Sequence, residues 1–369
     1  MAEGGYAMSV NKLSVAQDTT SYPRWIVLQL LEQCNLRCKM CYEWGLEGPY
    51  KSKKTLAQLD PELIKKIIVQ CSPGKPYYDF FGGEPLMYPW LSDILAMINH
   101  YGSIADFPTN GTLLEKHAEM LVETPPNKIW MSLDGPEEIN DRQRGKGVFK
   151  KVIKGIEKLY ELRESKGKQF PKMGVSFIIT PLNYMYVEEF FFKHIDLSML
   201  DHISMEVQLY ATEEQYAQYV EVLSERFDVH QAPYAKGMVW GDISSFSQID
   251  IPELTRQLNN VKEYCLKNSI HVITYPKTID EQNLHNYFSG QFHQMADKRN
   301  RCSLPWVYAE ITARGDVSPC HAFYDLTFGN VNEENLLDIW SSDKYKDYRA
   351  YMKKNMLPIC TACSRYYIY

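Results

Sequence analysis

The 369-residue sequence lacks several features that would place it in a special class of protein. No stretch approaches about eighteen consecutive apolar residues without a charge, which argues against a membrane-spanning helix. The first 25 residues contain no basic segment followed by an apolar one, so the pattern of a signal peptide is absent. Internal repeats and low-complexity segments are absent too. We therefore expect a soluble, cytoplasmic protein with no membrane partner.

An excess of positive charge is also lacking. The sequence has 40 Lys and Arg against 46 Asp and Glu, a formal net charge of −6. This balance argues against binding nucleic acid through bulk charge, and we expect no nucleic-acid partner. The composition of 45% hydrophobic and 23% charged residues is that of a folded chain. At about 150 residues per domain, the length predicts two to three domains.

Cysteine, in contrast, is not scarce. The chain has nine cysteines, an odd number, and no export signal. Cysteines in a reducing compartment rarely form structural disulfides, so clusters of them indicate metal or redox chemistry.

Short apolar segments alternate with longer amphipathic ones from Trp25 onward. Repeated strand–helix alternation predicts a parallel sheet of the α/β class, and six such units favour a partial (β/α)6 barrel over a flat sheet. The first helix has Asp60 as its N-cap and Pro61 at its first position. The pattern predicts strands at 25–33, 77–81, 104–107, 128–134, 173–180 and 203–210, and helices at 61–70, 90–101, 111–123, 149–165 and 185–195.

The pattern changes after residue 210. Helices are predicted at 213–227 and 251–268, with a candidate strand at 271–275, and the remaining sequence is punctuated by Cys and Gly. We therefore divide the chain into an N-terminal extension (1–24), the partial barrel (25–210), a connector (211–300) and a C-terminal domain (301–369).

Distinctive segments follow four successive predicted strands. They are a cysteine cluster, GGEP at 82–85, TNG at 109–111 and DGP at 134–136. In parallel α/β architectures the carboxyl ends of the strands share one face, and that face holds the active site. We expect the four segments to meet there.

The first cysteine cluster has the spacing C-x3-C-x2-C, formed by Cys34, Cys38 and Cys41 directly after a predicted strand. Three thiolates from one loop can hold three irons of a cubane cluster and leave the fourth iron open, which is typical of a catalytic centre. From the spacing alone, a zinc knuckle or a group of reduced core thiols is the alternative. The GGEP segment about forty residues later favours the iron–sulfur interpretation.

These motifs, together with Ser132 and Asp134 in MSLDGP, resemble the radical S-adenosylmethionine (SAM) family over residues 25–210. The resemblance implies that the three cysteines bind a [4Fe–4S] cluster whose open iron chelates the amino and carboxylate groups of SAM. It also implies reductive cleavage of SAM to a 5′-deoxyadenosyl radical, which abstracts hydrogen from a substrate. The electron would come from a reductant such as flavodoxin or ferredoxin.

The same resemblance assigns SAM contacts to seven positions. Gly82 and Gly83 would let the backbone approach the methionyl group, where no side chain fits. Arg144 would meet the ribose or the carboxylate, its alternative being a solvated surface charge. The other contacts would be Met40 near the adenine, Glu84 near the amine, Ser132 at the ribose and Leu209 over the adenine. The ordinary alternatives are a tight turn for the GGEP segment, a strand hydroxyl for Ser132 and a core position for Leu209.

Four further cysteines form a second constellation: Cys302-x12-Gly315-x4-Cys320, then Cys360-x2-Cys363 after 39 intervening residues. The pattern resembles the SPASM/Twitch auxiliary-cluster extension of radical SAM enzymes, and residues 328–345 resemble its linking helix segment. No cysteine follows Cys363, which favours the Twitch form with one auxiliary [4Fe–4S] cluster held by all four thiolates. A structural zinc ribbon is the alternative.

No pattern assigns an acid, a base or a hydrogen donor. A closed auxiliary cluster would act as electron relay or scaffold, which favours oxidation, whereas epimerisation needs a hydrogen donor that is usually a thiol. Cys265 is the candidate donor, and Cys71 is expected to be a small buried hydrophobe. Glu206 and Asn110 lie at the expected end of the strands and are candidates for substrate contact.

We expect a radical SAM oxidoreductase or isomerase that acts on a small polar metabolite, such as a sugar, cyclitol or nucleotide sugar. The alternative is a crosslink, oxidation or epimerisation of a ribosomal peptide or protein side chain. Peptide-modifying relatives commonly carry an N-terminal recognition domain, and only about 24 residues precede the first strand here, which favours the small molecule. An iron–sulfur electron carrier without SAM chemistry and a zinc-dependent binding module are alternatives from other classes.

Overall fold

The computed structural model describes residues 21–45, 48–240, 243–320 and 322–367. Within these ranges nine strands form one sheet in the order β7-β6-β5-β4-β3-β2-β1-β8-β9. Neighbours run parallel, except that β8 and β9 are antiparallel. The strands are β1 (Trp25–Leu31), β2 (Tyr77–Gly82), β3 (Ile104–Thr109), β4 (Lys128–Ser132), β5 (Lys172–Ile179), β6 (His202–Val207), β7 (His271–Tyr275), β8 (Tyr308–Ile311) and β9 (Val317–Ser318).

Helices follow most of these strands. In the part of the chain that the structure covers, no helix has the length and apolarity needed to cross a bilayer. The α-helices are α2 (Pro61–Cys71), α3 (Leu91–His100), α4 (Leu114–Glu123), α5 (Glu137–Arg144), α6 (Val148–Ser165), α7 (Val187–Glu189), α8 (Glu213–Phe227), α9 (Pro233–Lys236), α10 (Ile251–Lys267), α11 (Glu281–Phe288), α12 (Leu336–Trp340) and α13 (Asp343–Met352).

Local sequence signals account for most of these elements. The predicted N-cap is confirmed, since the Asp60 carboxylate accepts a hydrogen bond of 2.9 Å from the Glu62 amide. One predicted helix needs correction, and one helix close to the predicted site was missed. The helix expected at 185–195 is a short α7 between a 3-10 turn and a π turn at Phe190–His194. Helix α5, which ends at Arg144, was not predicted at all.

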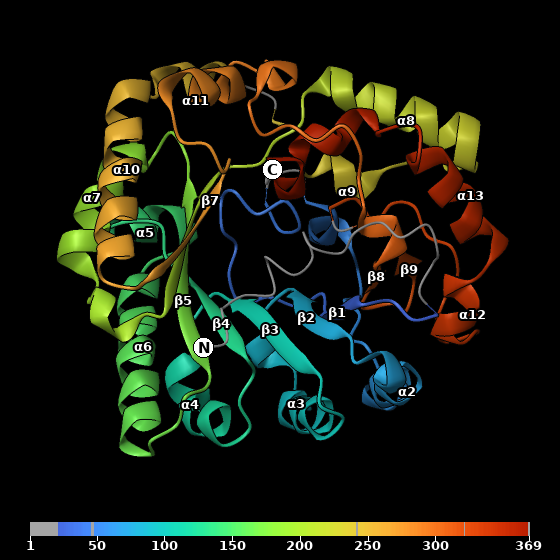
Figure 1. The fold of residues 1–369 in the computed structure, drawn as a ribbon, viewed down its shortest axis with the longest axis horizontal. Coiled ribbons are helices and arrows are strands. Elements are labelled where there is room, and N and C mark those ends of the chain that lie inside the picture. The colour runs from blue at the N-terminus through green and yellow to red at the C-terminus, as the bar shows by residue number, and fades with distance from the viewer. Residues whose placement is uncertain (1–20, 46–47, 241–242, 321, 368–369) are drawn as a thin grey trace.

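The predicted partial barrel is confirmed, and the structure extends it. Strands β1 to β6 lie side by side in chain order, as successive β–α units require. Strand β7, from the segment interpreted as a connector, continues the sheet beside β6, and β8, from the C-terminal region, pairs with β1. Figure 1 shows the strands curving around a central space, with α3, α4, α6 and α10 on the outside.

Alternation along β2 shows how the sheet separates its two sides. Tyr78 and Phe80 are fully buried in the core against the outer helices. Tyr77, Asp79 and Phe81 point to the opposite, concave side and line a cavity there. The concave side is therefore partly polar, unlike the layer between sheet and helices.

Candidate active site

The loop after β1 carries Cys34, Cys38 and Cys41 at the carboxyl end of the strand, all three half-buried. Backbone amides face two of the thiols: the Leu36 N–H lies 3.4 Å from the Cys34 Sγ, and the Trp44 N–H lies 3.4 Å from the Cys41 Sγ. Donors aimed at sulfur stabilise thiolates and tune iron–sulfur clusters. This donor set fits a cluster bound by three thiolates.

Gly82 and Gly83 hold this loop against the next strand. A Cβ at Gly83 would lie 1.8 Å from the Gln33 carbonyl oxygen, and one at Gly82, where φ is +102°, would lie 2.4 Å from the Leu31 carbonyl oxygen. The Gly83 N–H also donates to the Leu31 carbonyl at 2.7 Å. The structure thus gives these glycines a reason that the resemblance did not: they let the cysteine loop sit on the end of β2.

Glu84 is 1% exposed, and its carboxylate accepts three hydrogen bonds. The donors are the Thr109 hydroxyl at 2.6 Å, the Asn110 amide at 2.8 Å and the Leu86 amide at 3.0 Å. The Asn110 side chain in turn approaches the Cys34 Sγ at 3.8 Å. Glu84 therefore joins the GGEP segment to the TNG segment, and Asn110 contacts the cysteine loop.

Asp134 and Arg144 form a buried ion pair. Arg144 Nε lies 2.5 Å from Asp134 Oδ2, and their side chains are 9% and 0% exposed. Gln143 Nε2 and the Ile178 amide also donate to Asp134, at 2.8 and 2.9 Å. The Arg144 carbonyl lies 3.9 Å from the Cys38 Sγ. Arg144 is therefore not a solvated surface charge, because α5 packs directly against the cysteine loop.

One cavity of about 1230 Å³ occupies the concave side of the sheet. It brings together all the predicted cluster ligands and SAM contacts of the barrel, as well as two of the three catalytic candidates. Cys265, the third, is fully buried on α10 in the hydrophobic core and does not line this cavity, so its placement does not suit a hydrogen donor. The predicted residues that line it are Cys34, Cys38, Met40, Cys41, Gly82, Gly83, Glu84, Asn110, Ser132, Arg144, Glu206 and Leu209.

The interior of the cavity holds charged groups that the sequence analysis missed. Asp79, Asp106 and Lys128 project from β2, β3 and β4, and Arg365 reaches the cavity from the C-terminal region. Burial raises the pKa of Asp79 to about 8, with Asp106 raising it further and Arg365 opposing the shift. Burial also raises the pKa of Glu206. The alternation of Tyr77, Asp79 and Phe81 in β2 was the available signal, since it places an acidic residue on the concave side.

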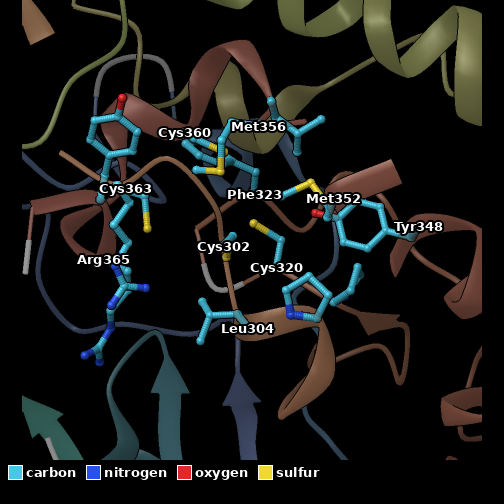
Figure 2. A pocket seen from close by; sticks show the side chains of 15 residues that line it. Cys302, Leu304, Cys320, Phe323, Tyr348, Met352, Met356, Cys360, Cys363 and Arg365 are labelled. Carbon is cyan, nitrogen blue, oxygen red and sulfur yellow. The ribbon is translucent and has the colours of Figure 1, made fainter. Parts of the chain in front are cut away.

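The four C-terminal cysteines lie around a separate, small apolar pocket. Cys302, Cys320, Cys360 and Cys363 line it together with hydrophobic side chains such as Phe323, as Figure 2 shows. Burial raises the pKa of all four thiols, that of Cys302 to about 11. In such surroundings the thiolate form needs a metal partner. Four converging thiols in an apolar pocket fit a closed cluster.

A single metal ion fits these sites less well than a cluster. Within the described ranges, no three His, Cys, Asp or Glu side chains are close enough together to hold one ion. A cubane spreads its thiolates over separate irons, so its ligands stand further apart than those of one zinc. The geometry therefore suits the iron–sulfur interpretation at both cysteine sets.

Polar contacts join the two cysteine regions. Arg314 makes a two-pronged ion pair with Glu32 at 2.9 and 3.0 Å. The Tyr324 hydroxyl donates a hydrogen bond of 2.7 Å to the carboxylate of Glu43, which lies two residues after Cys41. Burial raises the pKa of Glu43 to about 7. These contacts link residues nearly 300 positions apart, and no local sequence pattern marked them.

Comparison with known proteins accounts for both cysteine sets. A family model of the radical SAM superfamily matches residues 28–191, and a model of the SPASM iron–sulfur cluster-binding domain matches residues 302–364. The chain thus carries a radical SAM domain followed by a SPASM domain. The radical SAM domain binds a [4Fe–4S] cluster with SAM, and the SPASM domain binds an auxiliary iron–sulfur cluster. A reduced cluster at Cys34, Cys38 and Cys41 would supply the electron for cleavage of SAM to methionine and a 5′-deoxyadenosyl radical.

Several relatives match this radical SAM protein along most of its length. The tungsten-containing aldehyde ferredoxin oxidoreductase cofactor-modifying protein of Pyrococcus furiosus is 25% identical, covering 92% of this chain and 87% of its own. The serine-type anaerobic sulfatase-maturating enzyme of Bacteroides thetaiotaomicron is 26% identical, covering 89% and 77%. Streptococcus suis SuiB bound to S-adenosylmethionine has the same fold, with a TM-score of 0.62, 18% identity and coverage of 93% and 72%.

Proposed function

We propose that this radical SAM enzyme modifies a peptide or protein side chain, in place of the small polar metabolite expected from the sequence. The observation that carries the proposal is the similarity to the sulfatase-maturating enzyme, which spans 89% of this chain and 77% of that protein. A match of this extent is not confined to the radical SAM domain. The alignment also includes the segments after the radical SAM domain, which help to line the cavity where a substrate would bind.

The size of the cavity supports this proposal. Small-molecule sites usually measure about 300 to 1000 Å³. The cavity here is about 1230 Å³ and runs from the loop of Cys34 to Arg365 near the second cysteine set. Lys236 and Trp240 line it as well, outside the strands. This volume offers room for SAM beside the first cysteine set and for a side chain that enters from outside.

The polar groups inside have distinct proposed roles. Arg144, which contacts the cysteine loop, and Ser132, which ends β4 and lines the same cavity, would position SAM. Glu206 on β6 lines the same cavity, and its carboxylate accepts a 2.6 Å hydrogen bond from the Ser204 hydroxyl. Because burial raises the pKa of Glu206, this carboxylate is suited to accept a proton from the substrate.

The experiment offers two substrate pools to the anaerobically reconstituted, reduced protein with SAM. One is a pool of deuterated random peptides, and the other is a panel of deuterated sugars, cyclitols and nucleotide sugars. We expect deuterium in 5′-deoxyadenosine only with the peptide pool, accompanied by a mass change of a peptide. A variant with Cys34, Cys38 and Cys41 all changed to Ala should give neither. Deuterium transfer from the metabolite panel alone would contradict the proposal.

A further inference from the structure

Arg365 belongs to two sites at once. It follows Cys363 by two residues, and of the residues that the structure describes it alone lines both the apolar pocket of the four cysteines and the large cavity. Figure 2 shows its side chain beside Cys363, extending toward the strands of the barrel. The guanidinium therefore stands between the auxiliary cluster site and the substrate cavity.

The charge of Arg365 is not neutralised by a direct partner in the described ranges. Its Nε is buried and makes no hydrogen bond, and the guanidinium carbon lies 4.6 Å from the centre of the Trp25 ring. Asp79 and Glu206 face the same cavity but form no ion pair with it. Burial raises the pKa of the Asp79 carboxyl to about 8, which favours its neutral form near neutral pH. A net positive charge is thus held next to the auxiliary cysteines.

The first cluster lies much farther from this charge. Trp25, on which the guanidinium rests, begins β1, whereas Cys34 follows the other end of the strand. Seven strand residues at about 3.3 Å each separate the two ends by about 20 Å. An effect of Arg365 on a cluster should therefore fall chiefly on the auxiliary one.

We propose that Arg365 raises the reduction potential of the auxiliary cluster through its uncompensated positive charge. Reduction adds one negative charge to a cluster, and a nearby cation in surroundings of low polarity stabilises the reduced form. Arg365 would therefore act on the cluster through its electrostatic field, without contacting iron. The inference goes beyond the proposed function, because it depends on the two cluster sites and not on the substrate.

The test is a redox titration followed by electron paramagnetic resonance. The full chain carries Cys34, Cys38 and Cys41 changed to Ala, so that the signal comes from the auxiliary cluster alone. We expect Arg365→Gln to lower the ratio of reduced to oxidised cluster about tenfold at the original midpoint, a shift of about 59 mV to lower potential. Arg365→Lys keeps the charge and should retain most of the original potential. Lys353→Gln, which removes an exposed charge after α13, should leave it unchanged because water screens that site.

Three outcomes would overturn the proposal. The first is an unchanged potential in Arg365→Gln with the cluster fully loaded. The second is an equal shift in Arg365→Lys and Arg365→Gln, which would assign the effect to shape and not to charge. The third is loss of cluster iron in both Arg365→Gln and Arg365→Met while Arg365→Lys loads normally, which would make Arg365 a structural residue. Each outcome is independent of whether peptides or metabolites are modified.

Discussion

The two cysteine sites use the same side chain in opposite surroundings. Cys34, Cys38 and Cys41 are half-buried on a loop that borders a cavity of about 1230 Å³. The C-terminal set lies in a small pocket among hydrophobic side chains, with four thiols where the first site has three. A cluster at the first site would border the large cavity with one iron that has no thiolate ligand, whereas a cluster at the second site would have four thiolate ligands in apolar surroundings. Access to the cavity, more than the ligand type, separates catalytic from auxiliary chemistry here.

The two sites share one electrostatic property. Burial raises the pKa of Cys34 to about 11 and that of Cys302 to about 11. Metal-free thiols are therefore protonated near neutral pH, and cluster assembly must release protons. The difference between the sites thus arises from their neighbours and not from intrinsic thiol reactivity.

The largest expected effect comes from removing either set of cysteines. Changing Cys34, Cys38 and Cys41 to Ala should lower bound iron from about eight to about four per chain and abolish 5′-deoxyadenosine formation, because one [4Fe–4S] cluster is lost. Changing Cys360 and Cys363 to Ser should also leave about four irons but preserve SAM cleavage. Iron analysis and chromatography check both. Cys265→Ala is the matched control and should keep about eight irons, since its thiol lies in the core.

If the C-terminal variant retained about eight irons, the four cysteines would not hold a cluster, and the contrast between the two sites would disappear.

The next effect concerns the buried ion pair behind the first site. Arg144→Met leaves the fully buried Asp134 carboxylate without its cation, which should lower the free energy of unfolding by about 3 to 5 kcal/mol. Lys150→Met breaks an exposed pair with Glu137, whose side chains are 75% and 46% exposed, and should leave the free energy of unfolding nearly unchanged because water screens the pair. Urea unfolding measures both. Equal costs would mean that the pair does not support the loop.

A smaller effect is expected from the glycine that seats the cysteine loop. Gly83→Ala places a Cβ 1.8 Å from the Gln33 carbonyl, so the loop must shift, at a cost of about 1 to 3 kcal/mol. Loading of the first cluster should fall while the auxiliary cluster stays intact. Gly167→Ala has open space around its Cβ at a φ of +59°, and should cost about 1 kcal/mol without loss of iron. Equal iron contents in the two variants would contradict this role.

A dependence of stability on pH is expected from the polar interior. Asp79 has a folded pKa of about 8, far above the value of about 4 in an unfolded chain. Between these values only the unfolded chain is ionised, so the wild type loses stability as pH rises from about 4 to about 8. Asp79→Asn removes this loss, and its stability relative to wild type should increase across that window and then level off. The exposed Asp228→Asn control should show no such increase in pH-dependent unfolding.

Motifs that act within a few residues were predictable from the sequence, but their surroundings were not. The β–α order, the Asp60 cap and the two cysteine sets follow from short-range patterns. Asp79 and Arg365 escaped notice because their importance depends on a concave side formed by strands far apart in the chain. The same is true of the pairing between β1 and β8.

By itself the sequence determined the parallel sheet, the thiol spacing and the family, because periodicity and ligand spacing are local properties. Only the tertiary structure decided which groups share the cavity, why Gly83 has no side chain, and that Arg365 stands between two sites. Closing the sheet buries charges and brings distant residues into contact, and burial and contact depend on the whole fold. The motifs that bind the clusters are local in the sequence, whereas the environment of each motif depends on tertiary packing.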